Sequence, residues 1–277
     1  MNFGVYYFPT HYSMNIGDLA YELEARNFNQ LLACEHTHIP LSRKTPFPGG
    51  DLPEMYKHTL DPFVSLSFAA TQTKKLKVGT GICLLPQRDT IATAKSVASI
   101  DRLSNGRFIF GVGAGWNQDE MENHGILYKD RFKIMEEKIE ALKKLWTDEE
   151  ASYKGNYVNF DPVWCSPKPV TNPHPPVILG GETDHTLKRV VTLADGWLPR
   201  ADAKFDPFKE RKRLDSAAIS VGRSPESLSM TVFRAPTDRD QLQRYKEAGV
   251  TTVLLDVPSE SRENILPILD KYTELMK

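Results

Sequence analysis

The chain has 277 residues, of which 40% are hydrophobic and 26% charged, and its formal net charge is -1. This composition is typical of a soluble globular protein, and the charge balance predicts no attraction to nucleic acid or to an anionic membrane. No apolar run approaches the roughly 20 residues of a transmembrane helix. The N-terminus lacks the pattern of a signal peptide, and three widely spaced cysteines form no disulfide framework. We therefore expect a cytoplasmic protein.

Short β-rich runs alternate with longer helical stretches along the whole chain. In chain order, the expected strands are 3–8, 30–35, 76–82, 107–113, 177–179, 196–198, 228–233 and 252–255. The expected helices start near 16 and after 61, and then cover 90–103, 130–146, a segment from 183, 207–220, 238–248 and 265–275. An aromatic alternation around Gly155-Asn156 predicts a hairpin insertion before the fifth strand. Eight strands, each followed by a helix, predict a single-domain (β/α)8 TIM barrel over residues 1–277.

Local signals support the boundaries of several of these elements. Asp61 followed by Pro62 is typical of a helix start, and Gly106 is typical of a helix end. The structural alternative is a doubly wound open sheet, which usually carries a glycine-rich phosphate loop after its first strand. Here Pro9-Thr10-His11-Tyr12 follows that strand, so the barrel is the better prediction.

In such a barrel the chemistry lies at the carboxyl ends of the strands. Glu35 and His36 follow the second strand, with His38 two residues further on. Two histidines at this spacing can bind a metal, but one metal needs about three protein ligands. The fifth and sixth strand ends offer none, and Asp256 after the eighth strand is weak support by itself. We therefore predict no metal site. A structural role for either histidine stays open, as does a metal-dependent barrel hydrolase as a distant alternative.

Two glycine-rich segments also follow predicted strands. Residues 111–115 match a dinucleotide fingerprint only loosely, because Trp116 occupies its last glycine position. Such small residues let a backbone approach a flat ring closely, although a tight turn explains them too. Gly180 and Gly181 precede a helix whose exposed N–H groups can bind phosphate; the alternative is a turn without a ligand. Arg200, after the sixth strand, is a candidate for binding an anionic tail.

Other side chains permit two interpretations. An aromatic or apolar substrate pocket and ordinary core packing explain one set equally well: Tyr6, Phe8, His11, Trp116 and Trp197. A second set is basic and surrounds the helix at 207–220, where a solvated face is the usual explanation: Lys204, Lys209, Arg211, Lys212 and Arg213.

Several segments, taken in order, resemble the bacterial luciferase-like monooxygenase superfamily, and within it the probable coenzyme F420-dependent oxidoreductases. The resemblance covers most of the chain and rests on segments 78–88, 101–116, 167–169, 176–181 and 194–197. Each segment is weak by itself, but their order is specific. The resemblance implies a (β/α)8 barrel with coenzyme F420 at its mouth, or alternatively FMN.

The resemblance also implies roles for individual residues. Glu35-His36 occupies the place of an acid–histidine pair, in which Glu35 orients His36. A cis peptide at Gly81–Ile82 lies behind the cofactor ring, where glycine replaces the serine or cysteine of some members. The remaining cofactor-binding candidates border the ring, bind its phosphate or reach its acidic tail: Ala114, Gly115, Asn117, Gly180, Gly181 and Arg200.

The expected activity is hydride transfer between coenzyme F420 and a small organic substrate, with His36 donating or accepting a proton. The main alternative is an FMN-dependent monooxygenase, which would need a partner reductase to supply reduced flavin. A flavin-binding protein without catalysis is a distant alternative. The acidic tail of F420 suits Arg200 and the basic helix at 207–220, which favours F420 over FMN. We expect a homodimer.

Overall fold

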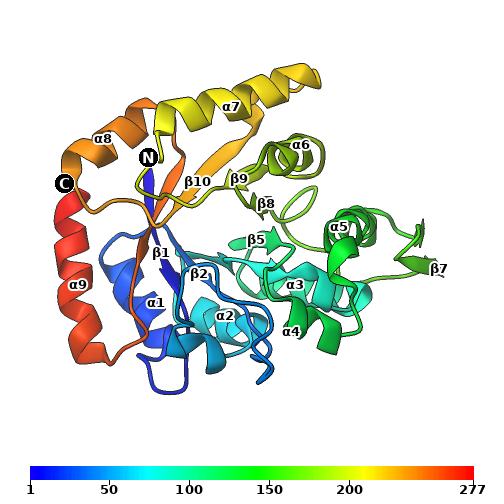
Figure 1. Cartoon of the computed structure of the whole chain (residues 1–277), viewed down its shortest axis with the longest axis horizontal. Coiled ribbons are helices and arrows are strands. Elements are labelled where there is room, and N and C mark those ends of the chain that lie inside the picture. The colour runs from blue at the N-terminus through cyan, green and yellow to red at the C-terminus, as the bar shows by residue number, and fades with distance from the viewer.

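The computed structural model describes residues 1–277, and its centre is a closed ring of parallel strands (Figure 1). The eight strands of the barrel are β1 (Asn2–Tyr7), β2 (Gln30–Ala33), β3 (Lys77–Thr80), β5 (Phe108–Gly113), β8 (Val177–Gly180), β9 (Gly196–Leu198), β10 (Ser229–Phe233) and β11 (Thr252–Asp256). Strand β1 pairs with β11 and β3 with β5, so the ring closes. The short β4 (Cys83–Leu84) continues the line of β3 and also pairs with β5. The predicted (β/α)8 barrel is confirmed.

Helices surround the barrel, and most begin or end within a few residues of the prediction. They are α1 (Ile16–Ala25), α2 (Pro62–Thr71), α3 (Thr90–Leu103), α4 (Gln118–Asn123), α5 (Arg131–Thr147), α6 (Asp184–Leu193), α7 (Pro207–Ser220), α8 (Arg239–Glu247) and α9 (Arg262–Leu275). Asp61 caps α2 through its side chain, as expected. No helix is both long and apolar enough to cross a membrane.

Several short elements complete the chain. The predicted hairpin is formed by β6 (Ala151–Lys154) and β7 (Asn159–Val163), and it projects from the side of the barrel (Figure 1). Four single 3-10 turns are η1 (Glu54–Lys57), η2 (Leu85–Gln87), η3 (Tyr128–Asp130) and η4 (Pro225–Ser227). Helix α4 was not predicted, because six residues are too few to show a helical period. This short helix carries Glu120, a residue of the cavity region.

Two apolar clusters form the core. The larger one fills the space between the barrel and its helices. The smaller one plugs the barrel interior and consists of Leu32, Ile109, Ile178, Leu198 and Leu254. Tyr6, Ile82 and Phe233 pack on this plug and are only partly buried. The interior of the barrel is therefore a packed core. Its layer nearest the carboxyl ends of the strands forms the floor of any cavity at those ends.

Gly111 lies where β3 and β5 approach each other closely. A side chain there would overlap the carbonyl oxygen of Thr80, whose hydroxyl donates to the Gly111 carbonyl at 2.6 Å. Because backbone would have to move, Gly111→Ala should lower the free energy of unfolding by about 1–3 kcal/mol, measured by urea unfolding. Gly180→Ala is the control, since the nearest atom to its added carbon is 3.4 Å away. Equal losses in both variants would contradict this explanation.

Candidate active site

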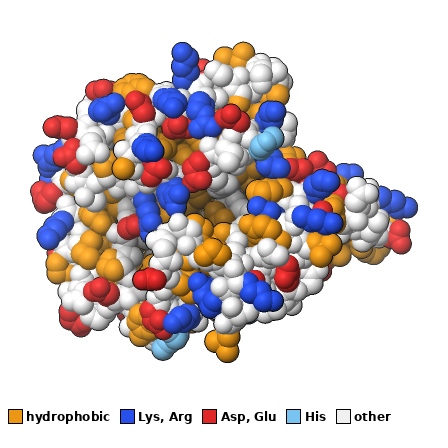
Figure 2. Space-filling model, viewed as in Figure 1, with side chains coloured by type: hydrophobic (Ala, Val, Ile, Leu, Met, Phe, Trp, Pro, Cys, Tyr) orange, Lys and Arg blue, Asp and Glu red, His pale blue; other side chains and the backbone are white.

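A cavity of about 490 Å³ opens at the carboxyl ends of the barrel strands. Its size is within the range of small-molecule and cofactor sites. Figure 2 shows this face hollowed at its centre, with hydrophobic side chains inside the hollow. The cavity brings together every predicted site residue except one: Glu35, His36, Gly81, Ile82, Ala114, Gly115, Gly180, Gly181 and Arg200. Only Asn117 does not line it.

The wall between β3 and β4 contains the predicted cis peptide bond, Gly81–Ile82. The side chain of Ile82 packs on the barrel plug and faces the cavity. A side chain at Gly113, on the neighbouring strand β5, would overlap the end of Ile82. Two glycines of β5 therefore have structural roles. Gly111 allows the close approach of β3 and β5, and Gly113 makes room for the side chain of Ile82.

His36 follows β2 and is 8% exposed. Its Nδ1 lies 2.7 Å from Oε2 of Glu120, a carboxylate on α4. The other oxygen of Glu120 accepts hydrogen bonds from the Thr37 backbone at 3.0 Å and from the Gln87 amide at 3.2 Å. No protein group binds Nε2 of His36. One ring nitrogen is therefore held by a buried acid, and the other is free for a ligand in the cavity.

Glu120 is fully buried, yet the surroundings favour its charged form. Burial would raise the pKa of Glu120, but hydrogen bonds and charge from His36, together with the bonds from Gln87 and Thr37, keep it below its ordinary value. A carboxylate can only accept hydrogen bonds, so Nδ1 of His36 must carry the proton. That leaves Nε2 of a neutral ring as the proton acceptor, or Nε2–H of a charged ring as the donor.

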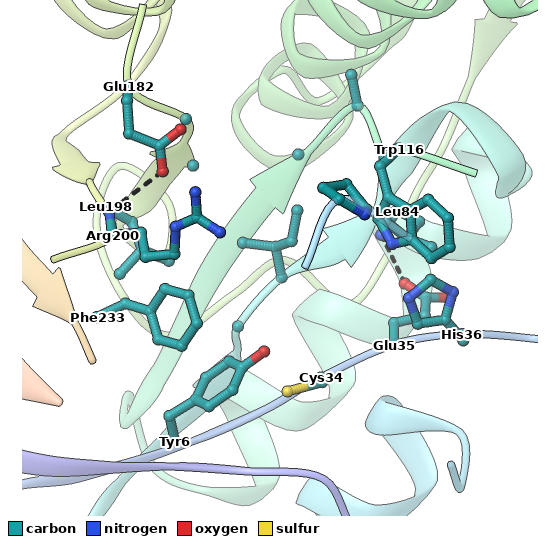
Figure 3. Close-up of a pocket in the computed structure, with 18 of the residues that line it drawn as sticks. Tyr6, Cys34, Glu35, His36, Leu84, Trp116, Glu182, Leu198, Arg200 and Phe233 are labelled. Atoms are coloured by element: carbon teal, nitrogen blue, oxygen red, sulfur yellow. Dashed lines mark hydrogen bonds between the residues drawn. The ribbon is translucent and has the colours of Figure 1, made fainter. Parts of the chain in front are cut away.

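Glu35 has a different contact from the one expected. The prediction that Glu35 orients His36 is wrong, because neighbouring residues of an extended segment point in opposite directions. The Glu35 carboxylate accepts from the Leu84 backbone at 2.7 Å and from Nε of Arg88 at 2.6 Å. Figure 3 shows the bond to Leu84 as a dashed line. Burial raises the pKa of Glu35 against the opposing charge of Arg88.

Asn117, predicted to bind the cofactor, does not line the cavity and has a structural role. It is buried and caps α4, where its side-chain oxygen accepts from the Glu120 backbone at 3.4 Å. The cap starts the helix that carries Glu120 to His36. The run Asn117-Gln118-Asp119-Glu120, a cap residue followed by acids in the first turn, is the sequence signal that could have revealed α4.

Aromatic rings surround the free side of His36. The rings of Tyr56 and Trp116 lie 5.1 and 5.9 Å from the imidazole, centroid to centroid. Phe47 packs against both, at 5.0 and 5.4 Å. Phe8 packs on Tyr56 at 4.6 Å and completes this aromatic collar. The collar makes the histidine end of the cavity apolar.

Of the aromatic candidates from the sequence, Tyr6, Phe8 and Trp116 line the cavity, whereas His11 and Trp197 do not. Trp197 is fully buried, and its indole donates to the Gly181 carbonyl at 2.6 Å. His11 packs against His58 outside the cavity, at a ring distance of 5.0 Å.

The opposite end of the cavity has the glycines Gly180 and Gly181 and the cation Arg200. Gly181 has φ of +121°, and a side chain there would lie 2.8 Å from Oγ1 of Thr186. Thr183 caps α6 by accepting from the Thr186 backbone at 3.1 Å. Arg200 lies beside Glu182, which accepts from its backbone N–H at 3.3 Å (Figure 3). The cavity therefore has a histidine end and a cationic end that begins at a helix N-terminus.

The two histidines after β2 do not converge on a common ligand. His38 uses Nδ1 to contact the Thr37 hydroxyl at 2.9 Å and Nε2 to contact Asn123 at 2.9 Å. No three His, Cys, Asp or Glu side chains lie together in an arrangement that could hold a metal ion.

Comparison with known proteins places this geometry in a family. The family model for luciferase-like monooxygenases matches residues 1–253. An uncharacterized protein of Mycobacterium tuberculosis is 37% identical, over 98% of this chain and 97% of its own length. The FMNH(2)-dependent dimethylsulfone monooxygenase of Pseudomonas putida is 28% identical over 54% of this chain and 44% of its own.

A likeness in fold extends the comparison. The solved structure of an F420-dependent secondary alcohol dehydrogenase superposes with a TM-score of 0.77 at 16% identity, covering 99% of this chain and 97% of that one. At that identity the likeness concerns the barrel alone. The family match, in contrast, extends over most of the chain. The chain belongs to the luciferase-like monooxygenase family.

Proposed function

We propose that this protein is an oxidoreductase that transfers hydride between coenzyme F420 and a small organic substrate. The observation that carries the proposal is His36, which presents a free Nε2 to the cavity while Glu120 holds Nδ1 at 2.7 Å. A histidine in this state is suited to exchange one proton with a bound substrate. The family includes both F420-dependent and FMN-dependent proteins, and the choice of F420 is part of the proposal.

The residues of the cavity fit a flat ring with a phosphate at one end. Ile82 offers a surface behind the ring, and Ala114 and Gly115 offer an edge without bulky side chains. Gly180 and Gly181 lie just before α6, where backbone N–H groups can bind a phosphate. When bound, the cofactor would supply hydride transfer at carbon 5 of its ring.

The work of the protein is then proton transfer and exclusion of water. Oxidation of an alcohol removes a hydride from carbon and a proton from oxygen, and Nε2 of His36 would take that proton. In the reverse direction the charged ring would return it to a carbonyl oxygen. The aromatic collar of Phe8, Phe47, Tyr56 and Trp116 favours neutral, apolar alcohols and ketones, since Arg200 lies beside Glu182 at the other end.

An FMN-dependent monooxygenase is the second candidate, because an FMNH(2)-dependent relative matches about half of the chain. The apolar collar would also shield reduced flavin from water. That reaction would need a reductase partner to supply the reduced cofactor. A flavin-binding protein without turnover would give a bound chromophore that no substrate changes.

Absorbance titration of the purified protein with F420 and with FMN tests the proposal. We expect saturable binding of F420, and weaker binding of FMN. Addition of secondary alcohols to the F420 complex should then reduce the bound cofactor. Tight binding of FMN alone would favour the monooxygenase, and binding of neither cofactor would overturn the whole assignment.

We also propose that the protein works as a homodimer in the cytoplasm. All three cysteines, Cys34, Cys83 and Cys165, are free and buried, which suits a reducing compartment. Sedimentation equilibrium would test the homodimer, and a monomer at micromolar concentration would contradict it.

A further inference from the structure

A second hollow lies on the outer surface of the barrel, between α6 and α7. Helix α7 lies at the top of Figure 1, and α6 lies below its right-hand end and contacts it. The groove has a volume of about 420 Å³ and is lined by four basic side chains and one acidic one: Lys188, Lys209, Lys212, Arg213 and Asp184. Lys209 and Lys212 lie on one face of α7, and Lys188 faces them from α6.

The charges of this groove are not balanced by the protein. Arg213 is the exception, since it pairs with Asp184 and Glu210, each at 2.5 Å. Asp184, the one acidic side chain of the groove, is therefore already neutralised. Lys188, Lys209 and Lys212 are exposed and form no ion pair. Arg211, on the same helix, turns away and pairs with Asp215 at 2.8 Å. The groove is therefore a local concentration of positive charge in a chain whose net charge is -1.

The groove begins one residue after the cationic end of the cavity along the chain. Gly181, Glu182 and Thr183 line the cavity, and the next residue, Asp184, lines the groove. Lys188 stands one helical turn further along α6, about 6 Å away along the helix axis. Arg213 also donates to the Glu182 carbonyl at 3.1 Å, which ties the connecting loop to α7. A ligand that leaves the cavity beside Gly181 would therefore pass the first turn of α6, where the groove begins.

From this arrangement we infer that the α6–α7 groove binds the acidic tail of the deazaflavin cofactor. The inference rests on the proposed function, and it adds a binding site that discriminates between cofactors. A phosphate at Gly180 and Gly181 would place the carboxylates that follow it beside Lys188, Lys209 and Lys212. FMN ends at its phosphate and has nothing to place in the groove.

The test measures binding without turnover. Cofactor fluorescence gives the Kd of intact F420, of F420 with its glutamyl residues removed, and of FMN. The wild-type protein should bind intact F420 about tenfold more tightly than the shortened form, because several exposed ion pairs each contribute modestly. Added salt should reduce that difference.

The decisive variant is Lys188→Ala/Lys209→Ala/Lys212→Ala. It should bind intact and shortened F420 equally, with the affinity for FMN unchanged. The control is Lys77→Ala/Lys246→Ala/Lys271→Ala, which removes the same charge from exposed positions far along the chain from α6 and α7 and should behave as the wild type does.

The possible failures are distinguishable. Equal wild-type affinity for the two F420 forms overturns the groove and leaves the proposed function intact. A parallel loss for FMN in the groove variant means a general charge effect, and also overturns it. If F420 does not bind to the wild type in either form, the proposed function fails together with the groove.

Discussion

Replacing His36 with alanine should lower kcat by about 10²–10⁴-fold while leaving the Kd for the cofactor within about twofold, since a positioned general acid or base contributes about that much. The split is expected because the proposed function puts the substrate at Nε2 of His36, whereas it puts the cofactor phosphate and tail at the opposite end, beside the glycines and Arg200. Measurement needs steady-state turnover with an alcohol that the wild type oxidises, and a separate fluorescence titration with cofactor.

His38→Ala is the matched control for that experiment. His38 lies two residues away, and both its ring nitrogens contact surface neighbours, Thr37 and Asn123. Its removal should change kcat by less than about twofold, in the range of surface substitutions. Unchanged turnover in His36→Ala would refute the catalytic role, and loss of cofactor binding there would assign His36 to the cofactor site instead.

The second large effect is expected from Glu120→Gln. A carboxamide can donate a hydrogen bond to Nδ1, so the ring proton can move to Nε2 and remove the acceptor that the substrate needs. Loss of the correct histidine tautomer costs about 10⁴-fold in kcat in a serine protease, where an aspartate holds the ring in the same way; at least about tenfold is expected here. Nitrogen chemical shifts of the His36 ring report the tautomer in the protein without cofactor.

Glu122→Gln separates this effect from a change in the helix itself. Glu122 is on the same turn of α4, exposed, and bonded only to Gln118 at 2.6 Å. It should leave the ring shifts and kcat unchanged. A Glu120→Gln protein with wild-type ring shifts and reduced kcat would show that Glu120 acts by packing and not by holding the tautomer.

Much of the site, and of the elements around it, could be predicted from local sequence patterns. The helix at Thr90–Leu103 and the strand at Gly196–Leu198 have the predicted bounds, because capping residues and β-rich runs act within a few positions. The resemblance located the cis bond at Gly81–Ile82, since its segments keep their order. The aromatic candidates were less certain, because Trp116 and Trp197 look alike in sequence, although one lines the cavity and the other is buried.

The sequence by itself determined that this chain forms an eight-stranded barrel with His36, Gly180 and Gly181 at the carboxyl ends of the strands. Strand periods and the carboxyl-end rule of barrels suffice for that. Only the tertiary structure decided which acid holds His36. The neighbouring Glu35 turns to Arg88, and Glu120 arrives from 84 residues away on a six-residue helix. Contacts at such separations depend on how loops close over the barrel, and no local pattern records that.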